Sequence, residues 1–201
     1  ELEKLANSLN NIFILPNDIT LSYAECGSEN AFYNPSLKKI TICYELMEKI
    51  ATTFYEVTET EEEYIEGVTG AVTFVLYHEL GHALVDAYSL PIPGREEDAV
   101  DRLSTIILLE GDPVFQRAPL NGAIFFLVST GSDDYQFWDE HSLNEQRFYD
   151  ILCLGYGKGI SEYESVVEKG LLPEERAERC PSEYQRTFAS WNVLLAPYTK
   201  N

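Results

Sequence analysis

The sequence has little positive charge. Its 14 Lys and Arg residues stand against 34 Asp and Glu residues, which gives a net charge of −20. Nucleic acids and anionic membranes both bind basic surfaces, so we expect neither as a partner. An acidic surface favours solubility. A sharper interpretation is that it attracts basic substrates.

The chain also lacks a long apolar run. The longest, such as residues 123–128, is far shorter than the roughly 20 apolar residues of a membrane-spanning helix, so we expect no membrane span. With 45% hydrophobic residues the chain has enough apolar material for a core. Its 201 residues suit a single domain over 1–201. The oligomeric state does not follow from the sequence.

No CxxC pair is present, which disfavours a zinc ribbon or a thioredoxin-like redox site. The order of the four cysteines favours the disulfides Cys26–Cys43 and Cys153–Cys180 among the three possible pairings. Two disulfides imply an oxidising compartment, so we expect an exported protein, which is periplasmic, at the cell surface or secreted. The alternative is four reduced cysteines in the core.

The spacing of apolar residues predicts an α+β protein, mostly helical, with a small sheet near the N-terminus and a helical C-terminal part. Strands are expected at 19–26, 30–33 and 40–43, the last two as a hairpin. Helices are expected at 1–11, 44–55, 68–88, 95–110, 119–129 and 142–154, with more helix after that. Ser142 and Glu145 match a capping box. We expect the acidic run 56–66 to be a loop or a solvated face. A calcium site is the alternative, but the spacing fits no EF-hand loop. We also expect 130–134 (TGSDD) to be a loop.

The motif that carries chemistry is His78-Glu79-Leu80-Gly81-His82, an HExxH sequence inside a strongly periodic predicted helix. Residues i and i+4 share a helix face, so both imidazoles can bind one metal ion. Glu79 can then act as the general base on a zinc-activated water. Gly81 is a poor residue for a helix interior, which indicates close packing or room near the metal. The alternative is that both histidines are structural.

A catalytic zinc site needs a third protein ligand. Val85 and Tyr88 stand where HExxHxxGxxH requires Gly and His, which excludes the metzincin pattern. The best candidate is Glu97, in the first turn of the helix that follows the Pro91–Gly94 break. Two helices joined by a short loop can pack antiparallel and bring Glu97 back to the histidines.

Asp101 lies at i+4 from Glu97 and can accept the free N–H of a zinc-bound histidine, which fixes the orientation of that ring. Glu96 and Asp98 are alternatives to Glu97 at the neighbouring positions. Asp86 is a weaker alternative, because one straight helix does not bring i, i+4 and i+8 side chains onto one metal.

His141 lies at a predicted loop–helix junction and can hydrogen-bond the oxyanion of a tetrahedral intermediate. Arg147 can position His141 or bind a substrate carboxylate. Rival oxyanion donors that the sequence does not rank are Tyr149, Tyr156 and Tyr184.

The predicted strand Asn30-Ala31-Phe32-Tyr33 is a candidate for substrate binding. Peptidases often bind a substrate as an extra strand along a sheet edge, through backbone hydrogen bonds. The alternative is an ordinary strand that packs on the core.

These residues resemble a known group. HELGH followed by Glu97-x-x-x-Asp101 is similar to the gluzincin class, in particular the membrane-embedded CAAX-protease and HtpX-like branch, where the Glu is the third zinc ligand and the Asp supports a ligand. That branch also has a downstream His and Arg, which His141 and Arg147 resemble. The chain lacks the transmembrane helices of that branch.

A closer resemblance is to a soluble family of metallopeptidases with a domain of unknown function. Its ordered pattern is a Cys, an N-A-F-Y strand, a second Cys, HELGHALV, an E-x-x-x-D helix, D-E-H-x-L-x-x-Q-R and two late Cys, and it spans about Cys26 to Trp191 here. The resemblance implies a zincin-like domain that hydrolyses peptide bonds with Zn2+.

Together these observations predict an exported zinc endopeptidase. Its zinc ligands are His78, His82 and Glu97, and Glu79 is the base. Two alternatives belong to other classes: a latent or inactive metal-binding interaction module, and a metal-dependent hydrolase of a non-peptide bond.

Overall fold

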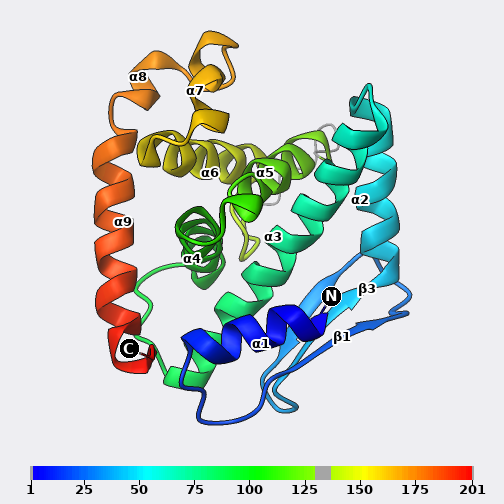
Figure 1. Cartoon of the computed structure of the whole chain (residues 1–201), viewed down its shortest axis with the longest axis vertical. Coiled ribbons are helices and arrows are strands. Elements are labelled where there is room, and N and C mark those ends of the chain that lie inside the picture. The colour runs from blue at the N-terminus through cyan, green and yellow to red at the C-terminus, as the bar shows by residue number, and fades with distance from the viewer. Residues whose placement is uncertain (1, 130–136, 201) are drawn as a thin grey trace.

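The computed structural model describes residues 2–129 and 137–200, and it confirms an α+β fold that is mostly helical (Figure 1). The strands are β1 (Thr20–Ala24), β2 (Ala31–Asn34) and β3 (Lys39–Cys43). The helices are α1 (Leu2–Ile12), α2 (Tyr44–Val57), α3 (Glu61–Tyr88), α4 (Glu96–Glu110), α5 (Ala118–Val128), α6 (Asn144–Lys158), α7 (Ser161–Glu168), α8 (Glu174–Ala177) and α9 (Cys180–Leu195), with short 3-10 turns η1 (Pro113–Phe115) and η2 (Ala196–Tyr198). The loop predicted at 130–134 lies outside the described residues.

The sheet has the strand order β1-β3-β2. Strand β1 runs parallel to β3, and β2 runs antiparallel to it with Tyr33 opposite Ile40, so the predicted hairpin is confirmed. Ile40 and Ile42 of β3 are buried, as expected for a central strand. Strand β2 is therefore an edge strand of this sheet, and it packs against α3.

Helix α3 is the centre of the molecule and runs diagonally through Figure 1. It packs against α2, α4, α5 and β2. Ala71, Phe74 and Leu84 are fully buried. A helix that is apolar on several sides is typical of a protein core rather than of a surface. No helix among the described residues is long and apolar enough to cross a bilayer.

The start of α3 corrects the loop interpretation of 56–66 but agrees with a solvated face, because Glu59 and residues 61–63 are exposed. The helix begins at Glu61, and Thr60 is its N-cap. The Thr60 hydroxyl accepts the N–H of Glu63 at 3.2 Å, and the Glu63 carboxylate accepts the N–H of Thr60 at 3.2 Å. The acidic residues thus occupy the first turn of a helix, where the helix dipole favours negative charge.

The start of α6 also differs from the prediction. The helix begins at Asn144 rather than after a Ser142–Glu145 capping box. The Leu143 N–H donates to the Gln146 side chain at 3.1 Å, one residue later than predicted. Leucine has no acceptor atom in its side chain, so only this half of a capping box forms.

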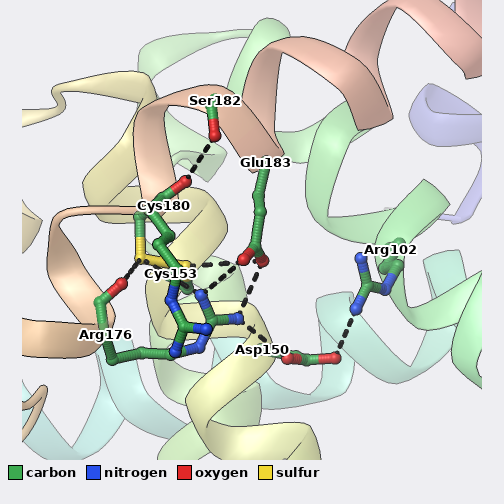
Figure 2. The surroundings of a disulfide bond; sticks show 8 residues. Arg102, Asp150, Cys153, Arg176, Cys180, Ser182 and Glu183 are labelled. Carbon is green, nitrogen blue, oxygen red and sulfur yellow. Dashed lines mark hydrogen bonds and ion pairs between the residues drawn. A yellow bond between two sulfur atoms is a disulfide. The ribbon is translucent and has the colours of Figure 1, made fainter.

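Both predicted disulfides are confirmed. Cys26–Cys43 joins the segment after β1 to the end of β3, and Cys153–Cys180 joins α6 to α9 (Figure 2). Cys43, Cys153 and Cys180 are fully buried. Each bond reduces the conformational freedom of the unfolded chain and so stabilises the fold.

A charged network surrounds the second disulfide (Figure 2). Arg176 of α8 donates to Glu183 at 2.8 and 2.9 Å and to Asp150 of α6 at 3.2 Å. Asp150 also accepts from Arg102 of α4 at 2.6 Å. These contacts tie α4, α6, α8 and α9 together.

Gly81 allows α3 and α4 to approach each other closely. A β-carbon built on Gly81 would lie 2.7 Å from Cβ of Val100, which is fully buried on α4. Close packing is thus the structural reason for glycine at this helical position.

We expect Gly81→Ala to lower the free energy of unfolding by about 1–3 kcal/mol, the usual cost of overpacking. This loss should appear although Ala is the better helix former by about 1 kcal/mol. Denaturant unfolding measures it. The control is Thr69→Ala on the exposed side of α3, which should stay within about 0.5 kcal/mol of wild type. A more stable Gly81→Ala variant would contradict the close approach.

Candidate metal centre

Helix α3 supplies three residues of the predicted site. The rings of His78 and His82 lie with their centroids 5.0 Å apart, as the i, i+4 spacing predicts. His78 and Glu79 are both 6% exposed, so they lie beneath the surface. The helix therefore presents two imidazoles side by side, with the carboxyl group of Glu79 next to the first.

Helix α4 brings Glu97 to the two histidines. One carboxylate oxygen, Oε2, lies 3.1 Å from Nε2 of His78, and the other, Oε1, lies 3.3 Å from Nε2 of His82. In Figure 1 α4 is seen nearly along its axis, whereas α3 crosses the view diagonally. The two helices therefore cross instead of lying antiparallel as expected, and the close approach at Gly81 still brings Glu97 into reach.

His141 joins the same cluster from the segment before α6. Its Nε2 lies 3.0 Å from Oε2 of Glu97. Ligand atoms of His78, Glu97 and His141 all lie within 4.8 Å of one another. All three histidines of the chain therefore direct Nε2 to one carboxylate.

A carboxylate stands beside Nδ1 of each ring. Nδ1 of His78 lies 2.7 Å from Asp101, that of His82 lies 2.8 Å from Glu96, and that of His141 lies 3.0 Å from Asp139. Such a partner fixes the ring and favours a proton on Nδ1, which leaves the lone pair of a neutral imidazole on Nε2. Sequence reasoning anticipated this contact for Asp101 and missed it for Glu96 and Asp139.

These contacts test whether the site suits a metal ion. Neutral rings with Nδ1 protonated point lone pairs at Glu97, and Oε2 of Glu97 is buried and makes no hydrogen bond. Acceptors that converge in this way repel one another unless protons or a metal cation lie between them. The 3.0–3.3 Å separations also resemble the distance of about 3.3 Å between ligands bound tetrahedrally at zinc–ligand distances near 2.0–2.1 Å. The residues therefore fit a metal ion.

Asp101 is buried and is also paired with Arg147 of α6. The guanidinium donates to both carboxylate oxygens, at 2.6 and 2.9 Å, and stacks on the ring of Phe126 at 3.7 Å. Arg147 is not among the described residues that line the cleft beside the histidines. Its contacts orient Asp101, and through Asp101 they orient His78.

The pKa values of the acids differ according to their surroundings. Burial raises the pKa of Glu79 above its ordinary value, and the nearby imidazoles only partly oppose this. Burial would also raise the pKa of Glu97, but in the metal-free protein the three imidazoles, whose own pKa values are raised, hold protons toward this carboxylate and keep its pKa well below the usual range. Burial would raise the pKa of Asp101 as well, but Arg147 and His78 together outweigh it and keep that pKa low. Glu97 and Asp101 are therefore carboxylates at neutral pH, and Glu79 is the stronger proton acceptor.

A cleft of about 770 Å³ opens beside these residues. The edge strand β2 and the residue before it form one side of the cleft, with the four predicted substrate-binding residues Asn30, Ala31, Phe32 and Tyr33. The other described residues that line it are Pro35, His78, Glu79, His82, Val85, Asp86, Arg95, Glu96, Glu97, Glu140 and His141. The predicted strand and the HExxH motif therefore face the same space.

Asp86, a weaker candidate for the third ligand, has other partners. Its Oδ2 accepts the Tyr33 hydroxyl at 2.6 Å and the Lys38 ammonium at 2.7 Å. Lys38 has a positive φ of 49°, which is uncommon for a non-glycine residue. The contacts of Asp86 with Tyr33 and Lys38 tie the β2–β3 hairpin to α3 at the rim of the cleft. Asp98, a further alternative, is not among the described cleft residues.

The three tyrosines proposed as rival oxyanion donors are likewise absent from the described lining of the cleft. Tyr184 is buried and its hydroxyl contacts Glu110. Tyr156 packs against the core, and Tyr149 is 40% exposed. Of the proposed oxyanion donors, His141 is therefore the one among the described cleft residues beside His78 and His82.

We expect Arg147→Ala to lower the free energy of unfolding by about 3–5 kcal/mol, because it leaves the buried Asp101 charge without its main partner. The folded-state pKa of Asp101 is lowered. Its contribution is therefore fully present above the unfolded pKa of about 3.9 and is lost as the pH falls through the folded pKa.

Denaturant unfolding of metal-free protein between about pH 3 and pH 8 tests this. The difference between wild type and Arg147→Ala should be largest at neutral pH and should shrink in acid. Arg186→Ala on the exposed side of α9 is the control and should change stability by less than about 0.5 kcal/mol. A difference that does not vary with pH would contradict the role given to Asp101.

Searches of curated proteins and of solved structures return no match to this chain. A family model does match, and it covers residues 1–195, which include the HExxH motif, Glu97, His141 and both disulfides. The family is DUF4344, and its description is "Putative metallopeptidase". The resemblance to a metallopeptidase family with a domain of unknown function is thereby confirmed, and the chain belongs to the DUF4344 family.

Proposed function

We propose that this protein is a zinc peptidase that holds its metal with His78, His82 and Glu97. The observation that carries the proposal is the convergence of imidazole Nε2 atoms on the Glu97 carboxylate, whose buried Oε2 atom makes no hydrogen bond. Two imidazoles and one carboxylate are the ligands of many catalytic zinc sites. Nitrogen and oxygen ligands in this combination favour zinc over magnesium or calcium.

A bound zinc ion supplies Lewis-acid chemistry, because it polarises a peptide carbonyl and lowers the pKa of a water molecule that it binds. Glu79 is the general base in this proposal. It is buried beside His78 and lines the cleft, and its raised pKa makes it a better proton acceptor than an exposed carboxylate. The same carboxyl group then passes the proton to the leaving amine.

His141 and Arg147 have supporting roles. During turnover His141 takes up a second proton and donates a hydrogen bond from Nε2 to the oxyanion, while Nδ1 keeps its proton beside Asp139. Its ring lines the cleft next to Glu97. Arg147 is a positioning residue, because its bidentate contact with Asp101 keeps that carboxylate on Nδ1 of His78. The expected contact of Arg147 with a substrate carboxylate is not part of the proposal.

The substrate is a peptide or protein segment that pairs with β2. The Asn30 carbonyl accepts the N–H of Cys43 at 3.0 Å, so this part of the main chain faces β3. The next N–H, that of Ala31, is bonded to the Asn30 side chain at 2.9 Å. The backbone N–H and C=O of one residue point to one edge of a strand, and those of the next residue point to the other edge. Alternate residues of β2 therefore direct main-chain groups away from β3, toward the cleft.

The two disulfides favour an exported protein, because such bonds persist in oxidising compartments. We therefore propose that the peptidase acts in the periplasm, at the cell surface or outside the cell.

Metal analysis tests the ligand set. Purified wild-type protein is expected to contain about one zinc ion per chain, as three-ligand catalytic sites do. His78→Ala and Glu97→Ala should each lose it, whereas Asp98→Asn, a matched change outside the cleft, should retain it. Wild-type protein that binds no metal even when zinc is supplied would overturn the proposal.

Hydrolysis of a diverse library of quenched fluorescent peptides tests the base. Glu79→Gln should keep its zinc and lose about 100- to 10,000-fold in rate, the usual contribution of general acid–base catalysis. The zinc content of the same sample is the control, because it separates a lost base from a lost metal. Full activity in Glu79→Gln would exclude Glu79 as the base.

A further inference from the structure

The third histidine is placed toward Glu97 in the same way as the two helical ones. Nε2 of His141 lies 3.0 Å from Oε2 of Glu97, a shorter distance than for His78 or His82. Its ring is also nearly parallel to that of His78, with centroids 6.3 Å apart. An oxyanion donor needs access to the substrate, but nothing requires it to contact the ligand carboxylate itself.

Three contacts hold His141 in this position. Oδ1 of Asp139 accepts its backbone N–H at 2.8 Å and lies 3.0 Å from Nδ1 of its ring. Arg95, at the start of α4, donates to its carbonyl oxygen at 3.1 Å. The contact of Asp139 with Nδ1 matches those of Asp101 with His78 and Glu96 with His82. The ring of His141 is thus oriented as a metal ligand is oriented.

We propose that His141 is a fourth protein ligand of the metal when no substrate is bound, which completes a donor set of three imidazoles and Glu97. This inference rests on the proposed zinc site and adds a resting state to it. Asp139 and Arg95 are positioning residues for His141. Zinc sites with four protein ligands are closed, whereas catalytic sites keep one position open.

His141 is also the ligand that can leave most readily. Its side chain is 41% exposed, compared with 7% for His78 and 17% for His82. It lies outside the helix pair, so its displacement does not require α3 and α4 to separate. A substrate or an inhibitor that enters the cleft therefore competes with His141 for the metal, and the released ring is free to serve the oxyanion.

Cobalt substitution tests this directly, because the visible spectrum of Co2+ reports the number and geometry of its ligands. Metal-free wild type, His141→Ala and Asp139→Asn are titrated with Co2+ and with Zn2+. Acetohydroxamate, a small chelating probe, is then added to each Co2+ protein. Glu140→Gln is the matched control, since Glu140 adjoins His141 and lines the same cleft. Circular dichroism confirms that each variant is folded.

If His141 is a ligand, His141→Ala weakens metal binding by more than about 10-fold, the smallest loss typical of removing even an outer partner of a ligand. Its Co2+ spectrum should differ from that of wild type, and acetohydroxamate should bind the variant more tightly than wild type. Asp139→Asn should weaken metal binding by about 10- to 100-fold, and Glu140→Gln should match wild type.

Equal metal affinity, equal spectra and equal acetohydroxamate binding in wild type and His141→Ala would overturn this inference and leave the proposed three-ligand site intact. Wild-type protein that binds neither Zn2+ nor Co2+ would overturn both. The two failures are therefore distinguishable from the same set of titrations.

Discussion

The close approach of α3 to α4 at Gly81 and Val100 is the contact on which the candidate site depends. With no side chain on Gly81, Val100 packs directly against the backbone of α3. Glu97 and Asp101 lie on one face of α4, the first before Val100 and the second after it. Both reach the histidines of α3 there. A larger separation of the two helices would move both carboxylates away from the imidazoles at once.

Charge within the site is arranged in layers. The innermost carboxylate, Glu97, faces the Nε2 side of all three rings, and a separate carboxylate stands on the Nδ1 side of each. Of these, Asp101 is buried and needs the buried cation of Arg147, whereas the carboxylates of Glu96 and Asp139 are 47% and 43% exposed and are partly solvated. Burial thus decides which carboxylate needs a cation from another helix.

Local patterns predicted much of this. The i, i+4 spacing predicted how His78 and His82 share a face, and the turn after α3 indicated that Glu97 returns to them. The Thr60–Glu63 capping signal was present in the sequence, but the acidic run around it resembled a loop. The α4 carboxylates that contact Nδ1 of the imidazoles were harder to predict. Adjacent positions on α4 point about 100° apart, and only the crossing of α3 and α4 decides which of them faces a histidine. Contacts across long stretches of sequence, such as that of Asp86 with Tyr33, have no local signature.

The cluster of Asp86, Tyr33 and Lys38 has a mechanical consequence. It joins the edge strand to the turn of α3 that follows His82, on the same rigid helix that carries Glu79. A peptide paired with β2 would therefore keep a constant offset from the base, whatever its side chains. The peptide bond that lies at Glu79 would then be selected by its position along the bound strand and not by its side chains. Asp86 on α3 would set that position, because it fixes the hairpin relative to the base.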